Sequence, residues 1–252
     1  RMGNTTRQNW FPAGGIENYK VESHNVDSNI TTGAWRAPIT NFLAVAEQSF
    51  FDELAKEMNI DAVKVRLDVL ERAKSNPVGS IDYEPEKMIG VIKLAAEKGN
   101  WGNPEAGVSK GFSAYYSHNT YVAEVADVTS VGGQPKITKM TTAVDCGIVI
   151  NPDAAINQIQ GGVVDGIGHA MYGDFAFVDG APQASNFDKF RLIRTKEAPK
   201  VDVYFVESLN DPTGLGEPSL PPAGGALANA IASATGRRVY KIPFTKQDIA
   251  LG

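Results

Sequence analysis

Apolar residues recur every three to four positions in three successive segments of the first hundred residues, which predicts three amphipathic helices. The first is expected over residues 42–58, with Thr40 as a candidate N-cap. The second is expected from Asp61, and the third from Pro85 to Gly99. The side chains expected to face inward are Phe42, Leu43, Ala46, Phe50, Leu54 and Met58 in the first helix, Val63, Leu67 and Leu70 in the second, and Met88, Val91, Ile92 and Ala95 in the third.

A different, alternating pattern follows. Residues 120–129 and 137–144 alternate between apolar and polar, and the glycine-rich segment that joins them predicts a β-hairpin. A third strand is expected over residues 201–207, and a Gly/Ala-rich helix over residues 223–235. Because helices and antiparallel strands mix without a regular βαβ rhythm, the pattern favours an α+β fold.

Two further expectations concern organisation. Residues 1–32 are polar and irregular, with a short alternating stretch over residues 19–26, so loop and strand are expected there. The whole chain, residues 1–252, is expected to form one region, with a sub-boundary allowed near residues 100–111 where the helical pattern changes to the strand pattern. The given sequence opens with Arg1 and has neither an initiator methionine at its start nor a charged-then-apolar leader, so a fragment or a processed subunit is expected.

The net charge, the lengths of the apolar runs and the few cysteine and histidine residues exclude several classes of function. The net charge is -5 and the sequence has no basic run, so a nucleic acid is not an expected partner. No stretch approaches the roughly 18 uninterrupted apolar residues of a membrane-spanning helix. Cys146 is the only cysteine, which excludes an internal disulfide and an iron-sulfur cluster held by this chain alone, since a cluster takes about four thiolates. The three histidines lack the short spacings of a zinc site.

Three segments hold more glycine and proline beside polar residues than folding requires, and each could bring backbone amides close to an anionic ligand. They cover residues 32–38, 144–170 and 214–222. Each also has a simpler interpretation: a turn before a helix, a helix that uses small residues for close packing, and an exposed turn. A dinucleotide fingerprint is not among the alternatives that fit, because Gly166-Ile167-Gly168 is not followed by a third glycine three residues later.

The third segment contains the clearest candidate for acid-base chemistry. Glu217 stands between Gly216 and Pro218 among apolar neighbours, where a carboxylate is well placed to act as a base near neutral pH. Taken alone, the same residue could be an ordinary exposed turn glutamate.

Together and in this order, the segments resemble the xanthine dehydrogenase/aldehyde oxidase family of molybdenum hydroxylases. The motifs that carry the resemblance are Gly33-Ala34-Trp35-Arg36, Tyr121-Val122-Ala123-Glu124-Val125, Asp145-Cys146-Gly147, Gln158, the glycines from Gly161 to Gly168, and Gly216-Glu217-Pro218. No Glu-Met-Gly-Gln-Gly motif lies between the first and third of these, which is similar to the isoquinoline 1-oxidoreductase beta-subunit type. Ala37-Pro38-Ile39 replaces the Gly-Phe-Gly of purine-oxidising members, so a purine is not the expected substrate.

The resemblance implies a fold, a set of site residues and a cofactor. The fold would be the C-terminal molybdenum-cofactor-binding region of the large subunit. Glu217 would be the catalytic base, and the metal would be held by a pterin dithiolene, with no side chain as ligand. The cofactor would be the molybdenum-molybdopterin cytosine dinucleotide. The residues expected to bind it are Gly33, Ala34, Trp35, Arg36, Gln158, Gly161, Gly162 and Gly216.

The resemblance also implies an activity and partners. An aldehyde or an N-heterocycle would be hydroxylated with water as the oxygen source, and electrons would pass to [2Fe-2S] clusters on a small partner subunit. An upstream molybdenum-binding segment or subunit would complete the site, in the cytoplasm or periplasm of a bacterium. Two alternatives remain open at this point: a non-catalytic scaffold or assembly subunit that retains the fold, and a nucleotide-binding domain that uses the glycines of residues 161–168.

Overall fold

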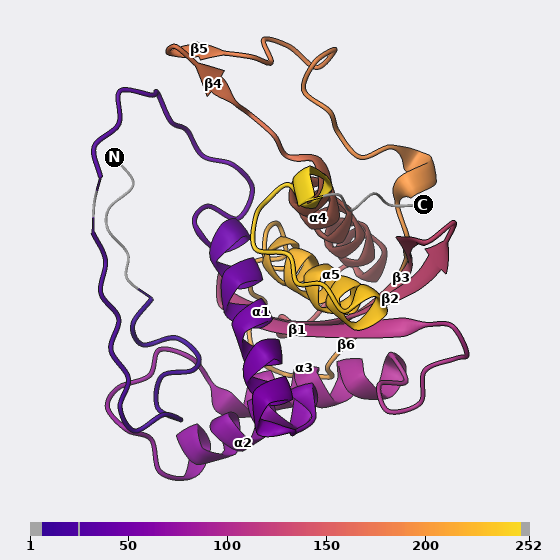
Figure 1. The fold of residues 1–252 in the computed structure, drawn as a ribbon. Helices are drawn as coiled ribbons and strands as arrows, with labels where there is room; N and C mark the ends of the chain where they lie inside the picture. The colour runs from indigo at the N-terminus through magenta and orange to yellow at the C-terminus, as the bar shows by residue number, and fades with distance from the viewer. Residues whose placement is uncertain (1–6, 25, 248–252) are drawn as a thin grey trace.

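A mixed β-sheet with helices on both faces organises the computed structural model, which describes residues 7–24 and 26–247 (Figure 1). The helices are α1 (Thr40–Met58), α2 (Ala62–Ser75), α3 (Pro85–Lys98), α4 (Pro152–Tyr172) and α5 (Leu220–Thr235), with 3-10 turns η1 (Thr195–Glu197) and η2 (Phe244–Gln247). The strands are β1 (Ser109–Ser117), β2 (Thr120–Val131), β3 (Gln134–Asp145), β4 (Phe177–Val178), β5 (Ala181–Pro182) and β6 (Lys200–Phe205).

The main sheet has the strand order β1-β2-β3-β6, and the short β4 and β5 pair separately. β2 runs antiparallel to both β1 and β3, whereas β6 follows the long connection through α4 and lies parallel to β3. The predicted hairpin is confirmed: Gly132 and Gly133 have φ values of 58° and 80°, as a turn of type I′ requires. The mixture of antiparallel strands with helices confirms the α+β class.

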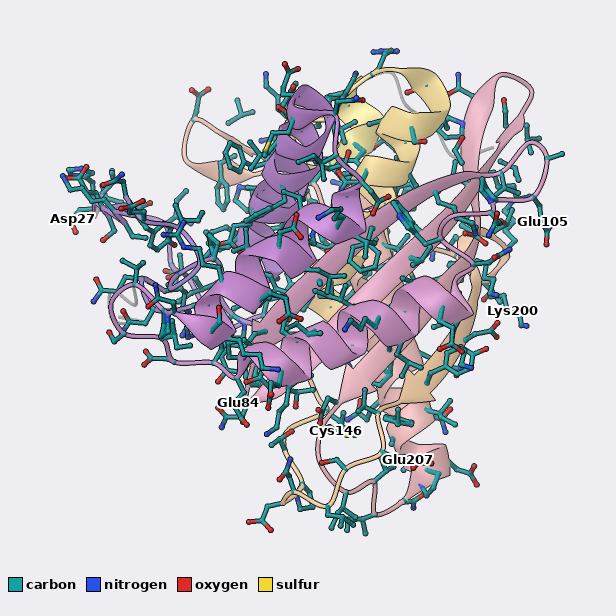
Figure 2. All side chains as sticks on the ribbon, turned by 90° about the horizontal axis from the view of Figure 1, so that it is seen from below. Asp27, Glu84, Glu105, Cys146, Lys200 and Glu207 are labelled. Carbon is teal, nitrogen blue, oxygen red and sulfur yellow. The ribbon has the colours of Figure 1, made fainter. Side chains whose placement is uncertain are left out.

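The two faces of the sheet hold separate parts of the core. α5 covers one face of the sheet, and α4 packs beside α5 and contacts β6. α3 crosses the opposite face, with α2 beside it (Figures 1 and 2). Val122 and Met140 point toward α4 and α5, while Phe112 and Val125 pack with α3. Figure 2 also places Cys146 and Glu207 near one end of the sheet, where the parallel strands β3 and β6 both finish.

β1 is an element that the sequence pattern did not predict. A β-carbon at Gly111 would lie 2.1 Å from the Ala230 nitrogen and 2.2 Å from the Ala226 oxygen, so α5 packs directly on the β1 backbone. The strand therefore has a glycine at a buried position where an apolar side chain would be expected. As a result, the sequence of β1 lacks the alternation of apolar and polar residues that predicts a strand. This close approach anchors α5, whose N-terminal end follows Glu217.

The second helix begins where it was predicted to begin, and the third follows the prediction at both ends. The Asp61 carboxylate accepts hydrogen bonds from the Val63 and Lys64 amides and caps α2, and α3 runs from Pro85 to its C-cap, Gly99. The expected loop and strand near the N-terminus is only half right. Residues 19–24 and 26 form no strand, residue 25 and residues 1–6 lie outside the described residues, and Gly14 makes an isolated bridge to Val78.

For α1 the predicted inward face is wrong. Phe42, Phe50 and Met58 are more than half exposed. The buried face instead carries Ala44, Gln48 and Phe51, together with further small, polar and apolar residues. The reason is a buried hydrogen-bond network that an apolar pattern cannot reveal: the Gln48 side-chain oxygen accepts from the Arg66 guanidinium at 3.0 Å, and its main-chain oxygen accepts from the Asn229 amide at 3.1 Å.

The start of α1 also differs from the expectation. Thr40 is the first helical residue and not the N-cap; its hydroxyl donates to the Ala37 carbonyl at 3.2 Å. Ile39 occupies the N-cap with a φ of 69°.

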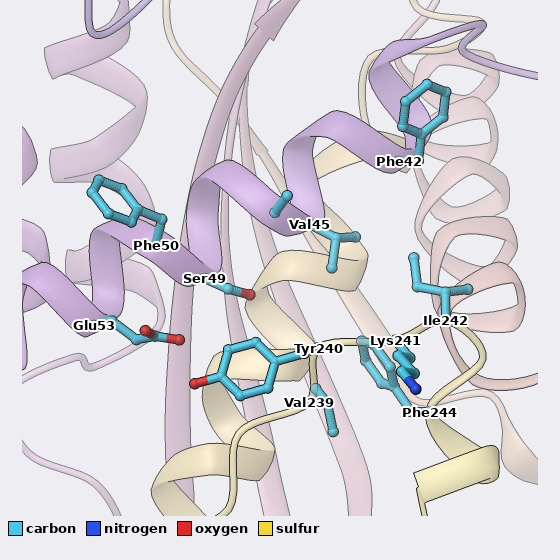
Figure 3. Close-up of a pocket in the computed structure, with 11 residues that line it drawn as sticks. Phe42, Val45, Ser49, Phe50, Glu53, Val239, Tyr240, Lys241, Ile242 and Phe244 are labelled. Carbon is cyan, nitrogen blue, oxygen red and sulfur yellow. The ribbon is translucent and has the colours of Figure 1, made fainter. Parts of the chain in front are cut away.

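The outward apolar side chains of α1 line a hollow of about 400 Å³. Its other wall is formed by the segment after α5, including Tyr240, Ile242 and Phe244 (Figure 3). None of the predicted site residues lines this hollow. Among the helices that the structure describes, none has the length and apolar character needed to cross a membrane.

Buried Glu124 gives a prediction about stability. Its side chain is fully buried, accepts from the Thr142 hydroxyl at 3.3 Å, and leaves Oε2 without a partner. Burial raises the pKa of Glu124 well above its ordinary value. The folded chain therefore keeps this proton at pH values where the unfolded chain has lost it, so stability falls as pH rises above the ordinary glutamate pKa, about 4.3.

The Glu124→Gln variant should abolish this dependence, because an amide does not ionise. We expect a higher free energy of unfolding than wild type near pH 8 and a much smaller difference near pH 4, measured by urea unfolding. Burial also raises the pKa of Glu47, to about 7, so some slope should remain in both proteins. Glu207→Gln, at an exposed position, is the matched control. Equal gains at both pH values would contradict the prediction.

Candidate active site

Arg36 joins the three glycine-rich segments at one point. Its Nε donates to the Gly216 carbonyl at 2.6 Å, and its Nη1 pairs with the Asp165 carboxylate at 3.0 Å. Its Nη2 donates to the main-chain and side-chain oxygens of Gln158 at 3.1 and 3.4 Å. A guanidinium suits this role because its donors form a rigid planar fork. Segments about 120 to 180 residues apart in sequence are thus fixed to a single side chain.

One face of α4 forms the floor of this site. The Asn151 side chain caps the helix by accepting from the Ala154 amide at 3.1 Å, and Pro152 begins it, as N-terminal preferences predict. From there, residues 158, 161, 162, 165 and 169 recur at helical spacing and share one face. Three of them, at positions 158, 161 and 165, are exposed, so this face is open to solvent.

The glycines of α4 serve close packing inside a helix and do not form a loop. A β-carbon at Gly162 would lie 2.1 Å from the Ser219 hydroxyl and 3.2 Å from Arg36 Nη2, and one at Gly166 would lie 2.4 Å from the Leu220 carbonyl. The close-packing interpretation of this segment is therefore confirmed. A nucleotide-binding loop at residues 161–168 is not, because these residues lie in mid-helix.

The loop of residues 33–39 enters the site through a strained backbone. Ala37 and Ile39 have φ values of 57° and 69°, in the left-handed region that costs non-glycine residues about 1–3 kcal/mol each. The Asn41 side chain donates to the Arg36 carbonyl at 3.3 Å and helps to hold this conformation. In this loop conformation the Ala37 amide donates to Glu217 Oε1 at 3.3 Å.

Glu217 is held from a second side by a residue that sequence analysis did not select. His118 Nε2 lies 2.5 Å from Glu217 Oε2, and about a third of each side chain is exposed. Asp165, the carboxylate partner of Arg36, was also missed. No local signal identifies either residue: His118 reaches Glu217 only because β1 and β2 bring their turn to this edge, and β1 itself was not predicted.

The remaining predicted residues form the open side of the site. Gly33, Ala34 and Trp35 are exposed, and the Trp35 ring meets the His169 ring edge-on at 4.9 Å between centroids. Burial lowers the pKa of His169, although the nearby Asp165 carboxylate opposes this effect. A β-carbon added at Gly33 or Gly216 would meet nothing within 4 Å. Packing therefore does not demand glycine at either position, and both leave bare backbone facing open space.

This geometry suits a flat, extended anionic cofactor. The exposed side offers accessible loop backbone at Gly33 and Gly216, open space above Gly161 on α4, the side-chain amide of Gln158, and the Arg36 guanidinium, which is paired with Asp165. Fixed backbone and amide dipoles can donate to an anionic group without adding a titrating group. Gly162 is buried, so it would affect such a ligand only by allowing Arg36 and Ser219 to approach α4.

Comparisons with known proteins point to one family of cofactor-binding proteins. Residues 46–199 match the molybdopterin cofactor-binding domain family. Isoquinoline 1-oxidoreductase subunit beta of Brevundimonas diminuta is 27% identical over 247 residues, which cover 94% of this chain and 30% of that protein. The membrane-bound aldehyde dehydrogenase (pyrroloquinoline-quinone) of Gluconacetobacter polyoxogenes is 26% identical over 261 residues, covering 96% and 33% respectively. The chain thus spans about a third of the length of these relatives.

Solved structures share the fold. The aldehyde oxidoreductase from Desulfovibrio desulfuricans superposes with a TM-score of 0.63 over 84% of this chain and 40% of that one, at 13% identity. The aldehyde oxidoreductase from Desulfovibrio gigas superposes with a TM-score of 0.58 over the same shares, at 17% identity. At these identities the likeness concerns the fold, and it confirms the fold expected from the motifs.

Proposed function

The chain belongs to the molybdopterin-binding xanthine dehydrogenase/aldehyde oxidase family, and from this premise we propose that it is the part of a molybdenum hydroxylase that carries the catalytic base, Glu217. One observation carries the proposal. The Arg36 guanidinium fixes together the loop of residues 33–39 (the Arg loop), α4 and the loop that contains Gly216, Glu217 and Pro218. As a result, the Glu217 carboxylate faces the backbone of the Arg loop at the open side of the site.

The proposed reaction converts a C–H bond of an aldehyde or N-heterocycle into C–OH, consuming one water and releasing two protons and two electrons. When bound, the molybdenum-pterin cofactor supplies the two-electron oxidation. Glu217 would accept a proton from the oxygen that attacks the substrate carbon. Its position supports this role: both carboxylate oxygens are held by neighbouring groups, and Glu217 sits next to the open backbone of Gly216.

The residues proposed to hold the cofactor surround Glu217. The backbone of residues 33–36 would donate to its anionic groups, and Gly161, which has no side chain on the exposed face of α4, would leave room for it. The Gln158 side chain would contact the pterin or an oxygen near the metal. Arg36 would add positive charge while keeping these donors in register. We propose the cytosine dinucleotide form of the cofactor, in keeping with the isoquinoline-type motifs of the sequence.

The proposed partners follow from what this chain lacks. Cys146 is its only cysteine and is buried, so the [2Fe-2S] clusters that take up electrons would lie on a small partner subunit. An upstream molybdenum-binding segment would supply the rest of the pocket, since the chain spans about a third of its relatives. Large exposed side chains such as Phe42, Phe50 and Phe187 are typical of a chain that works inside an assembly.

The alternative is a scaffold that keeps the fold without the chemistry, and composition of the native complex distinguishes the two. We expect this chain to purify with a larger upstream molybdenum-binding segment and an iron-sulfur subunit, because it carries the base but no cluster ligands. Size-exclusion chromatography with metal analysis should find molybdenum and iron in the same peak. A stable, molybdenum-free monomer of 27.0 kDa from the native source would contradict the proposal.

A further inference from the structure

The turn between β1 and β2 has an unusual residue at its tip. Ser117 pairs with Thr120, and the two residues between them, His118 and Asn119, have φ values of 56° and 59°. Two successive left-handed residues form the turn type that favours glycine, asparagine and aspartate. Histidine tolerates this conformation, but the turn alone does not call for its side chain.

The turn is docked on the loop that carries Glu217. The Thr120 hydroxyl donates to the Gly214 carbonyl at 2.7 Å, and its oxygen lies 2.7 Å from the Thr213 hydroxyl. A β-carbon at Gly214 would lie 3.6 Å from the His118 carbonyl, which shows how closely the two segments approach. The β1–β2 turn and residues 213–217 therefore form one local unit.

Within this unit, the Glu217 carboxylate has a hydrogen-bonding partner on each of two sides. Oε2 lies 2.5 Å from His118 Nε2, and Oε1 accepts from the buried Ala37 amide at 3.3 Å. Exposed ion pairs usually contribute little. Here, however, only 34% of the His118 side chain and 35% of the Glu217 side chain are exposed, and backbone on both sides is already fixed. A hydrogen bond to an ionised carboxylate in such a setting defines its orientation.

We propose that His118 is a positioning residue for Glu217: it donates from Nε2 to Oε2 and so fixes the orientation of the carboxylate that the Arg loop holds through Oε1. The inference rests on the proposed function, because orientation matters for turnover only if Glu217 is the base. A carboxylate that has lost one of its two anchors can rotate about its side-chain bonds, and a misplacement of about 1 Å can reduce a rate about 10²-fold.

Two matched substitutions separate this role from a purely conformational one. Glutamine can place a side-chain N–H near the position of the histidine Nε2, whereas asparagine is too short to reach Glu217. Asparagine, however, adopts the left-handed conformation more readily than glutamine. In the complete, cofactor-loaded enzyme, His118→Asn should lower kcat about 10²-fold with little change in KM. His118→Gln should recover most of that loss.

Hydrogen exchange gives a readout that does not depend on turnover. The Ala37 amide is fully buried and donates to Glu217 Oε1, so exchange in peptides that span Ala37 reports whether the carboxylate stays in place. In the loaded complex, mass spectrometry should show this slow amide exchanging about tenfold faster in His118→Asn than in wild type, and close to wild type in His118→Gln.

The possible outcomes decide between the explanations. Losses of equal size in both variants, or a larger loss in His118→Gln, would show that the turn conformation matters and would overturn the proposal. Wild-type turnover and exchange in both variants would also overturn it, while a low kcat in Glu217→Gln would leave the proposed function standing. If Glu217→Gln is fully active, the proposed function fails, and the Ala37 exchange alone decides whether His118 holds the carboxylate.

Discussion

The Glu217→Gln variant should lose activity by about 10² to 10⁴-fold in kcat, while the molybdenum content of the complex stays close to that of wild type. Glutamine keeps the size and hydrogen-bonding capacity of the side chain but removes its basicity. It can still accept from the Ala37 amide, so the Arg loop should keep its position. Steady-state kinetics and metal analysis of the same preparation check both parts of the prediction.

The control for this experiment is Glu207→Gln, the same chemical change at an exposed position just beyond β6. It should leave both kcat and molybdenum content unchanged. Parallel loss of molybdenum and activity in Glu217→Gln would mark Glu217 as structural. Full activity with full metal loading would remove it from the mechanism.

The second large effect is expected from Arg36→Met, which removes every contact of the guanidinium while keeping a long side chain. The wild-type side chain is 21% exposed and contacts Gly216, Asp165 and Gln158. Losing this set of charge-assisted hydrogen bonds should cost on the order of 3 kcal/mol. That corresponds to a roughly 10²-fold lower population of the assembled site. We therefore expect the purified complex to lose most of its molybdenum.

Arg72→Met is the matched control, because Arg72 lies on α2 and its guanidinium pairs with exposed Glu17 at a long distance of 3.7 Å. It should retain full molybdenum loading. If Arg36→Met folds and keeps its molybdenum as the control does, Arg36 does not organise the site, and the three segments must be held together by other contacts.

The elements that were predicted correctly from the sequence are those whose ends are marked by nearby residues. The Asp61 cap, the Pro85 start and the glycine turn after β2 each act within a few residues, so their effects are visible in the sequence. The buried face of α1 was predicted wrongly for the opposite reason. This face mixes apolar residues such as Phe51 with Gln48, which accepts hydrogen bonds from Arg66 and Asn229, and such long-range polar contacts leave no apolar periodicity.

The candidate site also combines residues that sequence motifs identified with residues that they did not. Motifs led to Arg36 and Glu217, and the structure brings the Arg loop within hydrogen-bonding distance of Glu217. They did not lead to Asp165 or His118. Asp165 contributes through its place on the α4 face, and His118 through the pairing of β1 with β2. Both depend on packing between segments that are distant in sequence.

The central claim is that the open face formed by the Arg loop, α4 and the loop ending at Glu217 binds the molybdenum cofactor. The most direct test is an anomalous difference map, recorded at the molybdenum absorption edge, from crystals of the complete enzyme. We expect its strongest peak beside the Glu217 carboxylate, facing the exposed backbone of residues 33–36. A peak in the hollow between α1 and the segment after α5, or elsewhere away from Glu217, would contradict the claim.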